Sequence, residues 1–129
     1  ADGESIRRAA AANPWTTLEG TLTGDAKAAF LAGCRFALHG CRVEAFGISV
    51  TEYLKAGLVP VVPKEGGSPE VVGLDALTYD GNAAAAEILV RLATDGEFYA
   101  KCAAHCRRRA ELFSAEAYFE RQRRLLDEI

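Results

Sequence analysis

EAFGISVTEYLKAGLVPVVPKEGG, which spans residues 44–67, predicts a helix followed by a strand. The nine residues Ile48–Ala56 have a helical composition, and Gly57 supplies a typical helix end. Leu58–Val62 is an uninterrupted apolar run rich in β-branched residues, which is typical of a parallel strand covered on both faces. This stretch therefore predicts one helix–strand unit of an α/β fold.

The rest of the chain continues the alternation of strands and helices. Further strands are expected at Trp15–Glu19, Arg35–Leu38 and Ala76–Tyr79. Helices are expected at Ser5–Ala12, Asp25–Cys34, Pro69–Val72, Ala83–Ala93, Glu97–Leu112 and Ala115–Glu128. We expect Asn82 and Ser114 to be helix N-caps, and the arginines at 107–109 to lie on a solvated face. The alternation predicts an α/β fold with a Rossmann-like, doubly wound parallel sheet and a C-terminal helical segment at 114–129.

Composition limits the classes of partner and compartment. The chain has 129 residues, half of them hydrophobic, and a net charge of −3, so it is expected to be one globular domain without a nucleic-acid partner. No basic tail or basic amphipathic stripe supports membrane attachment, which stays open. Four cysteines are present at 34, 41, 102 and 106, and His105 lies beside the last pair. Because no second pair has ligand spacing, we expect no metal, and free thiols in a reducing cytoplasm.

Two carboxylates provide the first indication of a site. Glu44 and Glu52 lie eight residues apart and flank the turn Phe46-Gly47. A helix N-terminus presents backbone N–H groups to an anion, and carboxylates accept hydrogen bonds from hydroxyls. The pair therefore predicts a site for a polyhydroxylated anion. The alternatives are that Glu44 is an ordinary loop acid and that Glu52 is a solvated helix residue paired with Lys55.

These residues also carry a family resemblance. E-A-F-G-I-S-V-T-E, then A-G-L-V-P-V-V-P, then G-G-S-P-E-V-V follow one another over residues 44–72. This order is similar to the E-x7-E region of retaining glycosyltransferases of the GT-B fold, glycosyltransferase family 4. The resemblance implies that residues 1–129 are part of a C-terminal nucleotide-sugar-binding domain. It implies transfer of a sugar from a nucleotide-diphosphate sugar to an acceptor hydroxyl with retention, without a metal cofactor.

The resemblance also implies roles for individual residues. Glu44 would lie at the transferred sugar as the catalytic acid of the motif, and Glu52 would bind the ribose hydroxyls. The diphosphate would be bound by the backbone N–H groups of Phe46, Gly47, Ile48 and Ser49. Phe46 is expected to anchor the core as well.

Three further residues lie beside this motif. His39 follows a strand at the carboxyl edge of the sheet, where open α/β sheets bind ligands, although a purely structural role is the alternative. Gly66 and Gly67 are expected to shape the loop over the donor sugar, and a tight turn without ligand contact is the alternative.

Parts of the resembled family have no counterpart in this sequence. The Arg and Lys that neutralise the leaving diphosphate are not matched, and two strands of the usual strand order are missing. A carbohydrate or lipid-linked acceptor would bind an N-terminal domain that is also missing. We therefore expect the 129-residue chain alone to be inactive. The alternative is a non-catalytic module that binds nucleotide weakly or serves as an interaction partner.

Overall fold

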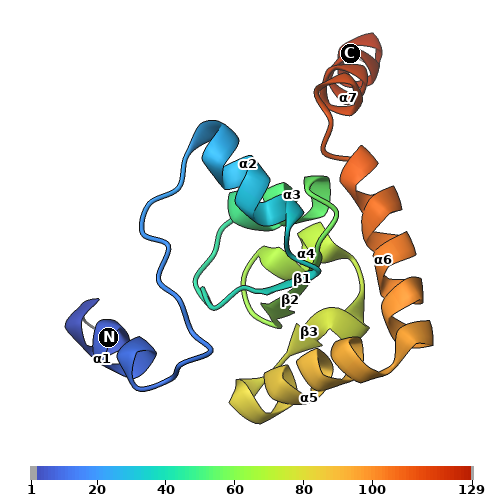
Figure 1. Cartoon of the computed structure of the whole chain (residues 1–129). Coiled ribbons are helices and arrows are strands. Elements are labelled where there is room, and N and C mark those ends of the chain that lie inside the picture. Colours follow the sequence, from blue (N-terminus) through green and yellow to red (C-terminus); the bar gives the residue numbers. More distant parts are fainter. Residues whose placement is uncertain (1–2, 129) are drawn as a thin grey trace.

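The structure is a computed structural model that describes residues 3–128 (Figure 1). Ile129, the end of the expected C-terminal segment, lies outside the described residues, as do the first two residues of the chain. The α-helices are α1 (Gly3–Ala11), α2 (Gly24–Ala32), α3 (Ile48–Lys55), α4 (Ser68–Val72), α5 (Gly81–Thr94), α6 (Gly96–Glu111) and α7 (Ala115–Asp127). The strands are β1 (Phe36–Leu38), β2 (Val59–Pro63) and β3 (Thr78–Tyr79), and a 3-10 helix spans Asp75–Leu77.

The three described strands form one parallel sheet in the order β1-β2-β3. Phe36 pairs with Val59 on one side of β2, and Val62 pairs with Thr78 on the other. Every residue of β2 is buried, and Val61 and Val62 have no exposed surface. The prediction of a central strand covered on both faces is therefore confirmed, as is the α/β, Rossmann-like class.

Helices α3 to α6 surround β2 and supply the rest of the core (Figure 1). Helix α3 contributes Val50 and Leu54, which repeat every four residues and so lie on one face. Helix α6 contributes Cys102 and Cys106 by the same spacing. All four cysteines are free in the described chain, and this pair is buried, which confirms the expectation of free, helix-packed thiols.

Three predictions about local structure are wrong. Trp15–Glu19 is irregular rather than a strand, because β propensity makes a strand only where a neighbour pairs with it, and Trp15 is 82% exposed. The expected strand Ala76–Tyr79 is reduced to two residues, since the 3-10 helix takes its first half. The N-cap of α5 is Asp80 instead of Asn82, because the helix already begins at Gly81.

Helices α1 and α7 lie away from the sheet (Figure 1). The hydroxyl of Ser114 accepts a hydrogen bond from the Ala117 N–H, which confirms the predicted N-cap of α7. The large apolar side chains of α7 are exposed, namely Tyr118, Phe119, Leu125 and Leu126. Among the described helices, none combines the length and the apolar character needed to cross a membrane.

Candidate functional site

The loop between β1 and α3 begins with His39, whose backbone is fixed by the neighbouring strands. The His39 N–H donates to the carbonyl of Val61 at 2.9 Å, and the Tyr79 hydroxyl donates to the His39 carbonyl at 2.8 Å. The His39 ring is buried and lies edge-on to the Tyr53 ring, with centroids 6.5 Å apart. His39 therefore lies at the carboxyl edge of the sheet, as the sequence predicted, in a rigid setting.

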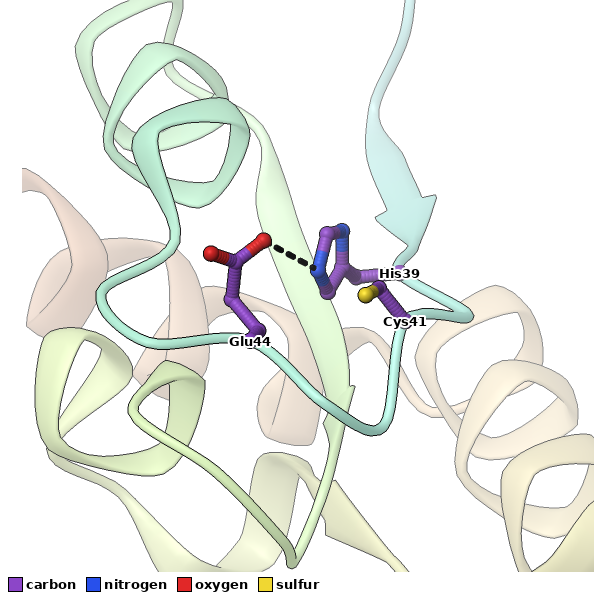
Figure 2. A group of neighbouring side chains, drawn as sticks. All are labelled: His39, Cys41 and Glu44. Atoms are coloured by element: carbon purple, nitrogen blue, oxygen red, sulfur yellow. Dashed lines mark ion pairs between the residues drawn. The ribbon is translucent and has the colours of Figure 1, made fainter.

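Glu44 lies further along the same loop and points at His39 (Figure 2). Its Oε2 is 3.7 Å from His39 Nε2, within ion-pair range but too long for a hydrogen bond. Among the described residues, His39 Nε2 is a buried nitrogen without a hydrogen-bond partner. The exposed thiol of Cys41 completes a group in which one ligand-type atom from each residue lies within 4.8 Å of the others.

The two glycines after β2 fix the position of this loop. The Gly67 N–H donates to the Glu44 carbonyl at 2.7 Å. A Cβ on Gly67 would lie 2.2 Å from the Ala45 carbonyl oxygen, and one on Gly66, where φ is +77°, would lie 2.7 Å from the Glu44 carbonyl oxygen. Both glycines thus allow the backbones of two loops to touch. Their contact with a donor sugar stays a prediction.

The N-terminus of α3 follows Glu44 in the chain. Gly47 is its N-cap with φ +94°, a left-handed conformation that favours glycine, and the structure describes no side-chain cap there. Ile48 is 70% exposed at the start of the helix. The expectation that Phe46 anchors the core is wrong, because its ring is half-exposed and only meets Phe113 edge-on, with centroids 6.1 Å apart. The first N–H groups of α3 receive no side-chain cap in the described chain, which is the setting in which a helix end can bind an anion.

Glu52, in the second turn of α3, pairs with a residue from another helix. Lys27 Nζ on α2 donates to Glu52 Oε1 at 2.6 Å, so the suggested pairing with Lys55 is replaced by one across helices. Both side chains line an open hollow of about 330 Å³ with Ser49 and Tyr53. Burial raises the pKa of the Tyr53 phenol, the Glu52 carboxylate raises it further, and Lys27 opposes both.

Glu44 is not among the residues that line this hollow. The hypothesis that the two acids face one crevice therefore stays a prediction. Ser49 and Glu52 face the same hollow on one side of α3, because they are three residues apart.

Helix α6 supplies contacts that the sequence patterns did not reveal. Arg109 donates through Nε to the carbonyl of Val71 at 2.8 Å and through Nη2 to the carbonyl of Glu70. His105 Nε2 lies 2.9 Å from the carbonyl of Val72. These side chains complete the hydrogen bonds at the end of α4, so the expectation that Arg109 is simply solvated is wrong. No local signal could have found these pairs or the Lys27 pair, because the partners are far apart in sequence.

Comparison with known proteins gives one match. The family described as glycosyl transferases group 1 matches residues 6–109, a range that includes the loop after β1, α3, β2 and both glycines. Neither the curated proteins nor the solved structures contain a match to this chain.

Proposed function

The chain belongs to the group 1 glycosyl transferases, and from this premise we propose that it forms the donor-binding region of a retaining hexosyltransferase. The donor would be a nucleotide-diphosphate sugar, and the acceptor a hydroxyl of a carbohydrate or lipid-linked molecule. One observation supports this proposal above all others. The N-terminus of α3, which has no side-chain cap in the described chain, has one carboxylate just before it, Glu44, and a second inside its second turn, Glu52.

The diphosphate would bind at the start of α3. The N–H groups of Ile48 and Ser49 carry the positive end of the helix dipole, which favours an anion by ~0.3–1 kcal/mol. Gly47 is buried, and a Cβ there would lie 3.2 Å from Ser68 Oγ, so this glycine serves the tight turn into α3, while the next residue, Ile48, is exposed. In the proposed transfer, this helix end replaces a metal ion together with the basic residues that the resembled family uses and that are unmatched in this sequence.

The ribose would bind at Glu52. Two vicinal hydroxyls can donate to one carboxylate, and each such charged hydrogen bond contributes about 1.5–3 kcal/mol. Lys27 holds one oxygen of Glu52 and fixes the orientation of the group. Ser49 and Tyr53 line the same hollow and would complete the nucleoside side of the site.

The transferred sugar would lie at Glu44. Its carboxylate can accept from hexose hydroxyls and stabilise the positive charge that develops at the anomeric carbon when the diphosphate leaves. The buried imidazole of His39 lies next to Glu44, with its Nε2 3.7 Å from Glu44 Oε2. Because Gly67 holds the Glu44 backbone, the carboxylate is presented at a defined place beside the α3 N-terminus.

The roles of the two acids can be separated by calorimetry with nucleoside diphosphates and the corresponding nucleotide hexoses. We expect Glu52→Gln to weaken both kinds of ligand by roughly 10- to 100-fold, because both contain the ribose. Glu44→Gln should weaken only the sugar-bearing ligand. Glu97→Gln, on the exposed surface of α6, is the matched control and should change neither affinity.

Two results would contradict this assignment. One is wild-type affinity of both ligands in Glu52→Gln, and the other is equal loss of both ligands in Glu44→Gln. Because the 129-residue chain alone is expected to be inactive, retention is tested separately in a complete transferase that contains it, by determining the anomeric configuration of the product with nuclear magnetic resonance. An inverted product would remove the proposed mechanism while leaving the binding site in place.

A further inference from the structure

We propose that His39, Cys41 and Glu44 form a binding site for a thiophilic divalent cation of the zinc class (Figure 2). The three residues offer an imidazole nitrogen, a thiolate sulfur and a carboxylate oxygen, which is a donor set that zinc accepts. They lie on one short loop at the carboxyl edge of the sheet, and their ligand atoms lie within 4.8 Å of one another. The bound cation would compete with the sugar donor for Glu44.

The distances fit a shared cation better than a direct contact. His39 Nε2 and Glu44 Oε2 are 3.7 Å apart, which is too long for a hydrogen bond. Zinc bonds of about 2.0–2.3 Å at tetrahedral angles place neighbouring ligand atoms about 3.3–3.7 Å apart. The unpartnered and buried Nε2 atom would gain a ligand bond, which removes the cost of leaving this nitrogen unsatisfied.

Two of the three ligands are already held in place, so little order has to be created on binding. The His39 backbone is bonded to β2 and accepts from the Tyr79 hydroxyl, and the Glu44 carbonyl accepts from the Gly67 N–H. Cys41 is exposed, and its Sγ makes a weak 3.5 Å contact with the carbonyl of Val43. Its side chain can therefore turn toward the other two ligands, and a cation can enter from solvent on this side.

The donor set also selects the class of cation. A thiolate and an imidazole favour zinc and its softer relatives, whereas Mg²⁺ prefers an all-oxygen octahedral shell. Three protein ligands leave the fourth tetrahedral position for water. The donor set therefore favours zinc over Mg²⁺ at this site.

Competition with the donor follows from the double use of Glu44, and this step rests on the proposed function. A carboxylate bonded to zinc has lost much of its capacity to accept from hexose hydroxyls. Zinc should therefore weaken the binding of a nucleotide hexose more than that of the nucleoside diphosphate, which does not reach Glu44. Free zinc would then inhibit the transfer reaction instead of assisting it.

The binding step is tested with Co²⁺ alone, a spectroscopic substitute for zinc, added to the reduced 129-residue chain without any nucleotide. We expect one Co²⁺ per chain and a thiolate-to-cobalt charge-transfer band, which Zn²⁺ abolishes and Mg²⁺ does not. Cys41→Ser should remove the band and weaken Zn²⁺ binding by about tenfold or more. Cys34→Ser, at the other thiol that is not buried, is the matched control and should keep the band.

A second pair of variants covers the other ligands. Glu44→Gln and His39→Gln should each weaken Co²⁺ binding while their thermal melts confirm that they fold. A band that persists in Cys41→Ser, or one lost in Cys34→Ser, overturns the site. Absence of stoichiometric binding overturns it too, and leaves the donor proposal intact because no nucleotide is present. If zinc binds but nucleotide-hexose affinity is unchanged, the metal site stands and the role of Glu44 at the sugar is wrong.

Discussion

Replacing Gly67 by alanine should cost about 1.5–4.5 kcal/mol of the free energy of unfolding, from the sum of two effects. The φ of Gly67 is −83°, so alanine can adopt this backbone without strain and the cost comes from space alone. Its Cβ would lie 2.2 Å from the Ala45 carbonyl oxygen, where ordinary contact begins at 3.4 Å, so one loop must move by about 1 Å. Overpacking of this kind costs about 1–3 kcal/mol. The same movement stretches the 2.7 Å bond from the Gly67 N–H to the Glu44 carbonyl, which contributes about 0.5–1.5 kcal/mol.

Urea denaturation followed by circular dichroism measures this loss. Gly96→Ala is the control, because nothing lies within 4 Å of its Cβ and its φ is not positive, so its stability should equal or slightly exceed that of the wild type. Since the movement displaces Glu44, Gly67→Ala should also lose affinity for a nucleotide hexose more than for the nucleoside diphosphate. If the two variants were equally stable, the tight contact between these loops would be refuted.

Three other predictions concern the core and α6. Val61→Ala should lose about 2–3 kcal/mol of the free energy of unfolding, because it leaves a cavity in the core. Val90→Ala, at a side chain that is 60% exposed, should change this free energy by no more than about 0.5 kcal/mol. Equal losses in urea denaturation would contradict the central place of β2. Arg109→Leu leaves two carbonyls of α4 without their partner and should cost about 1–3 kcal/mol, whereas Arg108→Leu should be neutral by the same assay. Burial raises the pKa of the Cys106 thiol from 9.0 to about 12. The contribution of this buried thiol to stability is therefore complete below pH 9.0 and is lost as pH rises toward about 12, because the unfolded chain ionises first. The fall in melting temperature with pH in that range should be shallower in Cys106→Ala, and an unchanged slope would contradict it.

Local patterns predicted the elements that carry their own signals. The apolar run of β2 can be buried only in a sheet covered on both faces, and Gly57 marks the end of the helix before it. The bounds of α3 and β2 were therefore predicted to within about one residue. Trp15–Glu19 has strand-forming residues as well, yet pairing depends on a neighbour that composition does not specify. Asn82 is a good N-cap residue, but the helix begins two residues earlier than expected, at Gly81 instead of Ala83.

In the candidate site too, features with a local sequence signal were predicted, whereas contacts between distant residues were not. The order of acid, glycine turn and second acid predicted where α3 begins, because glycine at a left-handed position and a helix start are local features. The partners of these acids were not predictable, since Lys27 reaches Glu52 from 25 residues away. The grouping of His39, Cys41 and Glu44 depends on the path of the loop, which backbone contacts with Gly66 and Gly67 determine.

The dependence of α4 on α6 has a consequence for synthesis on the ribosome. A helix of five residues cannot persist alone, because nucleation is unfavourable and the carbonyls at its end lack partners within the helix, apart from that of Pro69, which accepts from the Gly73 N–H. Its carbonyls at 70–72 are bonded by side chains that follow 33 to 39 residues later. The growing chain must therefore release α6 from the exit tunnel before α4, and the glycine loop in front of it, can settle. We expect the proposed donor site to form late during translation, as one of the last parts of this fold to become ordered.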